Sequence, residues 1–322
     1  MNDIRCFKPA WWLPNSHAQT LWPYLFQKKL RLHLARERLE LPDGDFIDLC
    51  WTDQQSDTIV MIIHGLEGSI DSHYARGIIP ALYGLGWRAV FMHFRGCSGE
   101  HNRLSRGYHS GDTGDIKYLV DTLHHRYPDT NLIAVGYSLG GNALLKYLGE
   151  NTDRRPLKGA VAVSVPFDLA SGALRLETGF SRVYQRHLLK RLQGKIISKF
   201  TGRQAPLPLD RVPDLDTFMR FDDAITAPLH GFQDVHDYYT RSSSRQFLKN
   251  IRVPTLIIHA QDDPFLTPDA IPAAKELSGE ISFELSKRGG HVGFISGNNP
   301  FKPAYWLEQR IPEFIQEVIG NL

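Results

Sequence analysis

The chain has 322 residues, of which 42% are hydrophobic and 22% are charged, and its formal net charge is +2. This composition is enough for a large core, built either as one domain with an insertion or as two domains. So small a net charge does not by itself imply nucleic-acid binding. The three cysteines, Cys6, Cys50 and Cys97, are widely spaced and form neither a disulfide framework nor a metal-site pattern, which favours a reducing compartment.

The N-terminal stretch has no basic segment followed by an apolar one, so no signal peptide is expected. No uninterrupted apolar stretch approaches the roughly 20 residues that a membrane-spanning helix needs. We therefore expect a soluble, cytoplasmic protein.

Short runs rich in Val and Ile alternate with segments of helical period along most of the chain. This alternation is typical of a mostly parallel sheet with helices on both faces. The first two runs flank a Pro-Asp-Gly turn and should form an antiparallel hairpin at one edge. The pattern predicts eight strands, at residues 36–41, 46–52, 58–65, 88–94, 131–138, 159–167, 255–261 and 281–288.

Helical periodicity predicts a helix over 112–126, a second one that follows Ser138 and continues through Leu148, and a C-terminal helix over 304–318. Pro312 should interrupt the last of these, because proline removes a backbone donor and clashes with the preceding turn.

The interval from about 168 to 252 contains no convincing strand. It shows helical patterns around 180–200, 214–225 and 235–248. We interpret it as a helical cap over the carboxyl edge of the sheet, where open α/β sheets bind ligands. The expected organisation is an N-terminal arm and first part of the core over 1–167, the cap over 168–252, and the rest of the core over 253–322.

A Gly-x-Ser-x-Gly sequence, centred on Ser138, follows the fifth predicted strand and precedes a helix. Glycines two positions before and after a serine are what a sharp strand-to-helix turn requires, because the turn strains the central residue and crowds the chain around it. The context predicts a nucleophile elbow with Ser138 as the nucleophile. The alternative is a tight turn in which the serine only caps the helix.

The base and the acid can be sought by chain order, because in this architecture they follow the serine as acid and then histidine. After residue 263 the sequence holds one histidine, His291, in a glycine-rich loop directly after the last strand. The alternative is an ordinary surface histidine. The acid should end the preceding strand, where Asp262 and Asp263 are adjacent. We choose Asp263, because the Asp-Pro-x-x-x-Pro loop should turn it toward the histidine, and Asp262 is then a neighbour or helix cap.

An oxyanion site needs two backbone donors. The N–H of Leu139 directly follows the nucleophile, and the N–H of Leu66 lies in a loop over 64–69 where Gly65 permits close approach. The alternative is an ordinary glycine-rich loop. Such a site requires no metal and no organic cofactor, and none is expected.

These motifs resemble those of the α/β-hydrolase superfamily, and more narrowly its YheT-like branch, which also contains eukaryotic abhydrolase-domain lipases and yeast medium-chain ester synthases. The narrow resemblance covers nearly the whole chain and depends on PAWWLPNSHAQTLWP, HGLEGS, HFRGCSGE, GYSLGGN, AQDDPF and GGHVGF, in that order. It implies the α/β-hydrolase fold, with Ser138 as nucleophile, Asp263 as acid and His291 as base, acting on carboxylic esters. Some related proteins carry a His-x-x-x-x-Asp acyltransferase signature near this histidine. Here Ser296 stands at the acid position, so that activity is not transferred.

We therefore expect a serine hydrolase that cleaves carboxylic esters of short- to medium-chain acyl groups, with a small-molecule ester as substrate and no nucleic acid as partner. The alternatives are an acyltransferase or thioesterase with the same acyl-enzyme, and a non-catalytic fold that binds a small ligand. The segment 180–200 is basic with interleaved apolar residues, which predicts an amphipathic helix that could contact an anionic membrane surface. The alternative is a solvated cap helix that covers the cleft.

Overall fold

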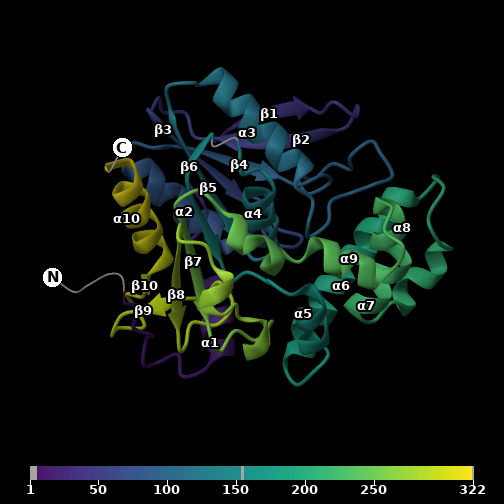
Figure 1. The fold of residues 1–322 in the computed structure, drawn as a ribbon. Helices are drawn as coiled ribbons and strands as arrows, with labels where there is room; N and C mark the ends of the chain where they lie inside the picture. The colour runs from purple at the N-terminus through teal and green to yellow at the C-terminus, as the bar shows by residue number, and fades with distance from the viewer. Residues whose placement is uncertain (1–5, 154–155, 321–322) are drawn as a thin grey trace.

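Eight strands form one sheet in the order β1-β2-β4-β3-β5-β6-β7-β8 (Figure 1). The computed structural model describes residues 6–153 and 156–320. The strands are β1 Ala35–Glu40, β2 Phe46–Trp51, β3 Thr58–Ile63, β4 Arg88–His93, β5 Asn131–Tyr137, β6 Leu157–Val163, β7 Thr255–Ala260 and β8 Ile281–Ser286. Each coincides with one of the eight predicted runs, so the predicted α/β fold with a mostly parallel eight-stranded sheet is confirmed.

The first two strands form the antiparallel hairpin expected at one edge of the sheet. β2 also runs antiparallel to β4, and the remaining neighbours are parallel. Every residue of β3 and of β7 is buried. A parallel sheet covered on both faces needs such continuous apolar strands, because neither face meets water.

Helices cover both faces of the sheet. α2 (His73–Gly84) and α10 (Leu307–Gly320) share one apolar cluster with the strands, and α3 (Gly114–Arg126) and α4 (Leu139–Glu150) share the other. The prediction that Pro312 interrupts the C-terminal helix was wrong, since α10 continues through it. Proline already has a helical φ, and near the start of the helix its missing N–H removes only one bond of the ladder. The helix begins at Leu307 because the preceding residues form β10 (Ala304–Tyr305), paired with β9 (Ile295–Ser296).

Residues 164–254, between β6 and β7, are all described by the structure, and they form helices and no strand. They gather at one end of the sheet (Figure 1) and pack around an apolar cluster of their own. The single helical pattern predicted over 214–225 is divided among three short elements, one of them a π-helix. The elements are α5 Leu169–Leu176, α6 Ser181–Phe200, η1 Leu209–Asp214, α7 Phe218–Phe221, the π-helix η2 Asp222–Thr226, α8 Ala227–His230, α9 Val235–Ser242 and η3 Ser244–Asn250, with η4 Pro268–Ala270 and η5 Ala274–Glu276 after β7.

Helix α6 is less amphipathic than the sequence suggests. Val183 is 51% exposed although it is apolar, whereas Lys199 is 5% exposed although it is charged. The core-facing and solvent-facing residues of this helix are therefore mixed. No helix in the described ranges is long and apolar enough to cross a bilayer.

The N-terminal arm contains a helix that the sequence analysis did not predict, α1 (Ser16–Phe26). The side chain of Asn15 caps it by accepting the N–H of Ala18 at 2.9 Å. Asparagine is among the most favourable residues at this position, so the cap was a usable signal. The helix packs against the loop that follows β8, which places the arm beside the candidate site.

Candidate active site

Ser138 lies at the tight turn between β5 and α4, with φ +52° and ψ −120°. This backbone conformation is sparsely populated by residues other than glycine and is typical of functional sites. The glycines on either side are required by contact. A Cβ on Gly136 would lie 2.6 Å from the carbonyl oxygen of Gly140, and a Cβ on Gly140 would lie 2.4 Å from that of His64. The predicted strand–turn–helix context is therefore present.

The structure brings together the three side chains that the sequence analysis selected. His291 Nε2 lies 2.9 Å from Ser138 Oγ, and His291 Nδ1 lies 2.8 Å from Asp263 Oδ2. The other carboxylate oxygen of Asp263 accepts the N–H of Phe265 at 2.8 Å, and the Phe265 ring stacks on the imidazole with centroids 4.0 Å apart. Asp263 is 3% exposed and His291 9%. In this arrangement an imidazole can accept the hydroxyl proton while its tautomer is held.

Asp262, the alternative acid, has a different partner. Its Oδ1 accepts the N–H of Gly290 at 3.0 Å, and burial raises the pKa of this carboxyl group. Asp262 thus supports the loop that carries His291 rather than the imidazole itself.

The loop that carries His291 is held by the N-terminal arm through residues that the sequence analysis did not single out. Thr20 Oγ1 accepts the backbone N–H of His291 at 2.9 Å. The fully buried amide of Gln19 accepts the N–H of Ile295 at 2.7 Å and donates to its carbonyl at 3.0 Å. Gly290 has φ +62°, and a Cβ there would lie 2.5 Å from a carbonyl oxygen of α1. The arm therefore fixes the position of the imidazole, and the SHAQT part of the N-terminal motif was the available signal.

Both predicted oxyanion donors lie beside the nucleophile. The N–H of Leu139 is the first of α4, and that of Leu66 lies in the loop after β3. A Cβ on Gly65 would be 3.2 Å from the Cβ of Ser138 and 3.7 Å from its Oγ, so this loop runs against the serine. Within the described residues neither N–H donates a hydrogen bond. Both are thus available to a ligand.

A fully buried histidine orients the Leu66 donor. His64 Nε2 accepts the N–H of Phe94 at 3.0 Å, so the proton is on Nδ1, which donates to the carbonyl of Gly65 at 2.6 Å. Burial lowers the pKa of His64 to about 3, and the ring is therefore neutral. In a planar trans peptide the C=O and the following N–H point in opposite directions. Because His64 holds the Gly65 carbonyl on one side of this peptide, the Leu66 N–H is fixed on the opposite side.

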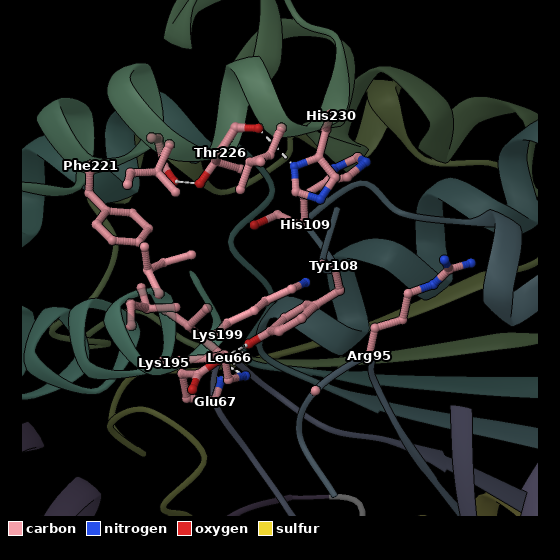
Figure 2. Close-up of a pocket in the computed structure, with 18 of the residues that line it drawn as sticks. Leu66, Glu67, Arg95, Tyr108, His109, Lys195, Lys199, Phe221, Thr226 and His230 are labelled. Atoms are coloured by element: carbon pink, nitrogen blue, oxygen red, sulfur yellow. Dashed lines mark hydrogen bonds and ion pairs between the residues drawn. The ribbon is translucent and has the colours of Figure 1, made fainter. Parts of the chain in front are cut away.

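A cavity of about 750 Å³ opens over Ser138 and His291. A volume of this size suits a small-molecule ligand, and its walls are largely apolar. The apolar residues come from α1, α5, α6 and the residue directly before α6, and include Leu21, Leu169, Leu176, Phe180, Val183 and Leu188. A second cavity, of about 100 Å³, is also lined by Leu66 and Leu139 (Figure 2). In the described part of the chain no cluster of His, Cys, Asp and Glu side chains is arranged to hold a metal ion.

Fold and site define the class of this protein. The family model described as alpha/beta hydrolase fold matches residues 58–298, and the chain belongs to this family. It is 42% identical to the Escherichia coli (strain K12) protein called "Putative esterase YheT", over 96% of this chain and 92% of that protein. The resemblance to the YheT-like branch is therefore confirmed.

More distant similarities agree with this placement. The chain is 29% identical to the Monoacylglycerol lipase of Saccharomyces cerevisiae (strain ATCC 204508 / S288c), over 80% of this chain and 59% of that protein. Among solved structures, the esterase Pf2001 of Pyrococcus furiosus superposes with a TM-score of 0.58 at 18% identity, covering 90% of this chain and 92% of that one. At that identity the likeness shows the fold alone.

Proposed function

We propose that this protein is a serine hydrolase that cleaves carboxylic esters of short- to medium-chain acyl groups, with Ser138 as nucleophile, His291 as base and Asp263 as orienting acid. The hydrogen-bonded series Asp263–His291–Ser138 at the base of an apolar cavity carries this proposal. The similarity to proteins named esterase and monoacylglycerol lipase supports an ester substrate. In this proposal residues 168–252 form the cap over the cavity, and 1–167 and 253–322 form the arm and the core.

The proposed reaction has two halves. His291 takes the proton of Ser138 as the hydroxyl attacks the ester carbonyl, and the N–H groups of Leu66 and Leu139 hold the oxyanion. The alcohol leaves with the proton from His291. Water, activated by the same imidazole, then hydrolyses the acyl-enzyme. Asp263 stabilises the imidazolium in both halves.

A fluorophosphonate probe tests the nucleophile, because it reacts covalently with activated serines. We expect the native chain to be labelled and the Ser138→Ala variant to remain unlabelled. Ser98→Ala is the control, since the Ser98 hydroxyl donates to Asp48 on β2 and its removal should not affect labelling. Labelling that survives in Ser138→Ala would overturn the assignment.

Product analysis tests the reaction. p-Nitrophenyl esters of increasing chain length should show highest kcat/KM for short to medium acyl groups, because the cavity of about 750 Å³ limits the chain. With added ethanol the free acid should dominate the products. A dominant ethyl ester would indicate an acyltransferase, preferred turnover of thioesters a thioesterase, and labelling of Ser138 without turnover a binding protein.

We further propose that the rim of the cavity contacts an anionic lipid surface. Tyr24 on α1 and Phe180, directly before α6, both line the cavity and are 56% and 49% exposed. The Tyr24 ring lies 6.3 Å from that of His187, so the two helices are neighbours at the rim. Neither sequence around them, 4–36 or 178–209, contains an acidic residue. Exposed apolar side chains can insert among lipids, and the surrounding basic residues are attracted to anionic headgroups.

Liposome sedimentation tests this contact. We expect binding to vesicles that contain anionic phospholipid, weaker binding at high salt, and little binding to zwitterionic vesicles. Phe180→Ser should weaken it, whereas Phe301→Ser, which changes an exposed phenylalanine outside the rim, should not. Indifference of the native chain to lipid charge and salt would contradict the proposal.

A further inference from the structure

Glu67 follows the candidate oxyanion donor Leu66 directly and is held on every side. It has φ +52° and is 6% exposed, which is unusual for a glutamate in a loop. Its backbone N–H, its carbonyl and its carboxylate all have partners. Figure 2 shows Glu67 with Tyr108 and Lys195 beside it. A non-glycine residue in this conformation persists only where its surroundings determine it.

Tyr108, on a loop of the core, makes two of these contacts. Its hydroxyl accepts the N–H of Glu67 at 2.8 Å and donates to Glu67 Oε1 at 2.8 Å. The Tyr108 ring in turn stacks on the ring of Phe94, which directly follows β4, with the ring centroids 4.9 Å apart. The core therefore holds one side of Glu67.

Helix α6 of the insertion holds the other side. Lys195 Nζ donates to Glu67 Oε1 at 2.6 Å, and Arg191 Nη2 donates to the Glu67 carbonyl at 2.6 Å. Lys195 Nζ also lies 3.1 Å from Cys97 Sγ, but burial raises the pKa of that thiol to about 11, so the thiol is neutral at physiological pH. The carboxylate of Glu67 is therefore the negative group that faces Lys195.

The next lysine of α6 does not duplicate this contact. Lys199 Nζ donates to Asn102 Oδ1 at 2.7 Å and to the carbonyl of Arg106 at 2.8 Å. Its charge is directed to another part of the small cavity, away from Glu67. Of these two lysines, Lys195 is therefore the one that pairs with the Glu67 carboxylate.

We propose that Lys195 and Arg191 are positioning residues, which fix the oxyanion loop from the insertion and offset the negative charge of Glu67 next to the site where the oxyanion forms. This inference rests on the proposed function, because an oxyanion forms only if Ser138 attacks a carbonyl. The ground-state ester is neutral, whereas its tetrahedral intermediate is an anion. Interactions that act on the intermediate and not on the ester change kcat rather than KM.

The first test replaces Lys195 with Met, which keeps most of the side-chain volume and removes the charge. We expect kcat on a p-nitrophenyl ester to fall about 10- to 100-fold, less than or similar to the loss of an oxyanion donor, with KM changed by less than about threefold. The affinity for a trifluoromethyl ketone, which mimics the tetrahedral adduct, should fall by the same factor as kcat/KM. Lys190→Met is the matched control, since Lys190 is an exposed lysine of the same helix, and its kinetics should equal the native ones.

The second test separates charge from packing. If an unpaired Glu67 carboxylate opposes the oxyanion, Glu67→Gln should restore part of the lost kcat in the Lys195→Met background. Lys195→Arg should retain most of the activity because it keeps the donor and the charge. Arg191→Gln, at an exposed position, removes the guanidinium that donates to the Glu67 carbonyl together with its charge, and it should lower kcat in the same manner. The inference therefore stays testable if Lys195→Met does not fold.

The outcomes are distinct. Native kcat in both Lys195→Met and Arg191→Gln would overturn the inference, and so would a raised KM with unchanged kcat, which would make these residues substrate ligands. Absence of Ser138-dependent ester turnover in the native chain would instead overturn the proposed function.

Discussion

The strained backbone conformation of Ser138 should lower the free energy of unfolding of the protein. With φ +52° and ψ −120°, this residue occupies a region that costs a non-glycine residue about 1–3 kcal/mol. Glycine lacks the Cβ that causes the strain. We therefore expect Ser138→Gly to be more stable than Ser138→Ala, although both variants lack the nucleophile.

The expected difference follows from comparing the two variants directly. Both lose the contact between Ser138 Oγ and His291, so that loss cancels. Glycine removes about 1–3 kcal/mol of strain but adds about 0.4–1 kcal/mol of unfolded-state entropy. The net gain for Ser138→Gly over Ser138→Ala is about 1 kcal/mol. At about 2.1 cal/mol/K per residue, the 322-residue chain should show a Tm difference of about 1.5 °C per kcal/mol.

Thermal and urea unfolding of the two variants measure this difference. Ser198, an exposed residue inside α6, supplies the control pair, because there Ser198→Gly should be less stable than Ser198→Ala by up to about 1 kcal/mol. The sign should therefore reverse between the two positions. If Ser138→Gly is no more stable than Ser138→Ala while the control pair behaves as expected, the strain argument is refuted.

Three further predictions concern the acid, the arm and the half-buried carboxyl group of Glu308. Asp263→Asn should lower kcat about 10⁴-fold, as expected when the tautomer of the base is lost, whereas Asp262→Asn should cost far less; ester kinetics of both variants decide the choice. Gln19→Leu should lower kcat up to about 100-fold in the same assay, because a 1 Å displacement of the imidazole loop costs about that much. Burial raises the pKa of Glu308 to about 7, although Gln27 donates to it at 2.6 Å. Because this folded-state pKa exceeds the unfolded value of about 4.5, the free energy of unfolding of the native chain should fall as the pH rises through this window. Glutamine does not titrate, so the stability of Glu308→Gln relative to the native chain should increase by up to about 3 kcal/mol between pH 4 and pH 8. Urea unfolding at several pH values measures this change.

The strands of this fold could be predicted because each one is a local pattern. β3 and β7 are buried on both faces and are therefore nearly uninterrupted apolar runs, which polar and glycine-rich segments delimit. The elbow was equally local, since Gly136, Ser138 and Gly140 fall within five residues. His291 and Asp263 could be selected because chain order in this fold limits the candidates.

The contacts that hold the site could not be predicted in this way. Thr20 meets the backbone of His291 across 271 residues of sequence, and Lys195 meets Glu67 across 128. No periodicity encodes which distant surface a polar side chain will meet. The helical pattern predicted around 214–225 did not reveal the division into short elements. The half-buried carboxylate of Asp222 accepts from Thr226 within the π-helix and from Tyr239 on α9, a long-range contact that the 3.6-residue pattern does not encode.

Helix α6 contacts two of the loops that make up the site, and this limits how a substrate can reach Ser138. The hydroxyl of Ser181, at its N-terminal end, donates to the carbonyl of Pro264, next to Asp263, at 2.7 Å. Further along the same helix, Arg191 and Lys195 bind Glu67 in the loop that carries the candidate oxyanion donor Leu66. Lifting α6 from the core would break these three bonds and move the acid loop and the oxyanion loop together. An opening between α1 and α6, where the cavity meets the apolar rim, would break none of these three bonds. If the proposed function holds, we expect the ester to enter there while the site stays assembled.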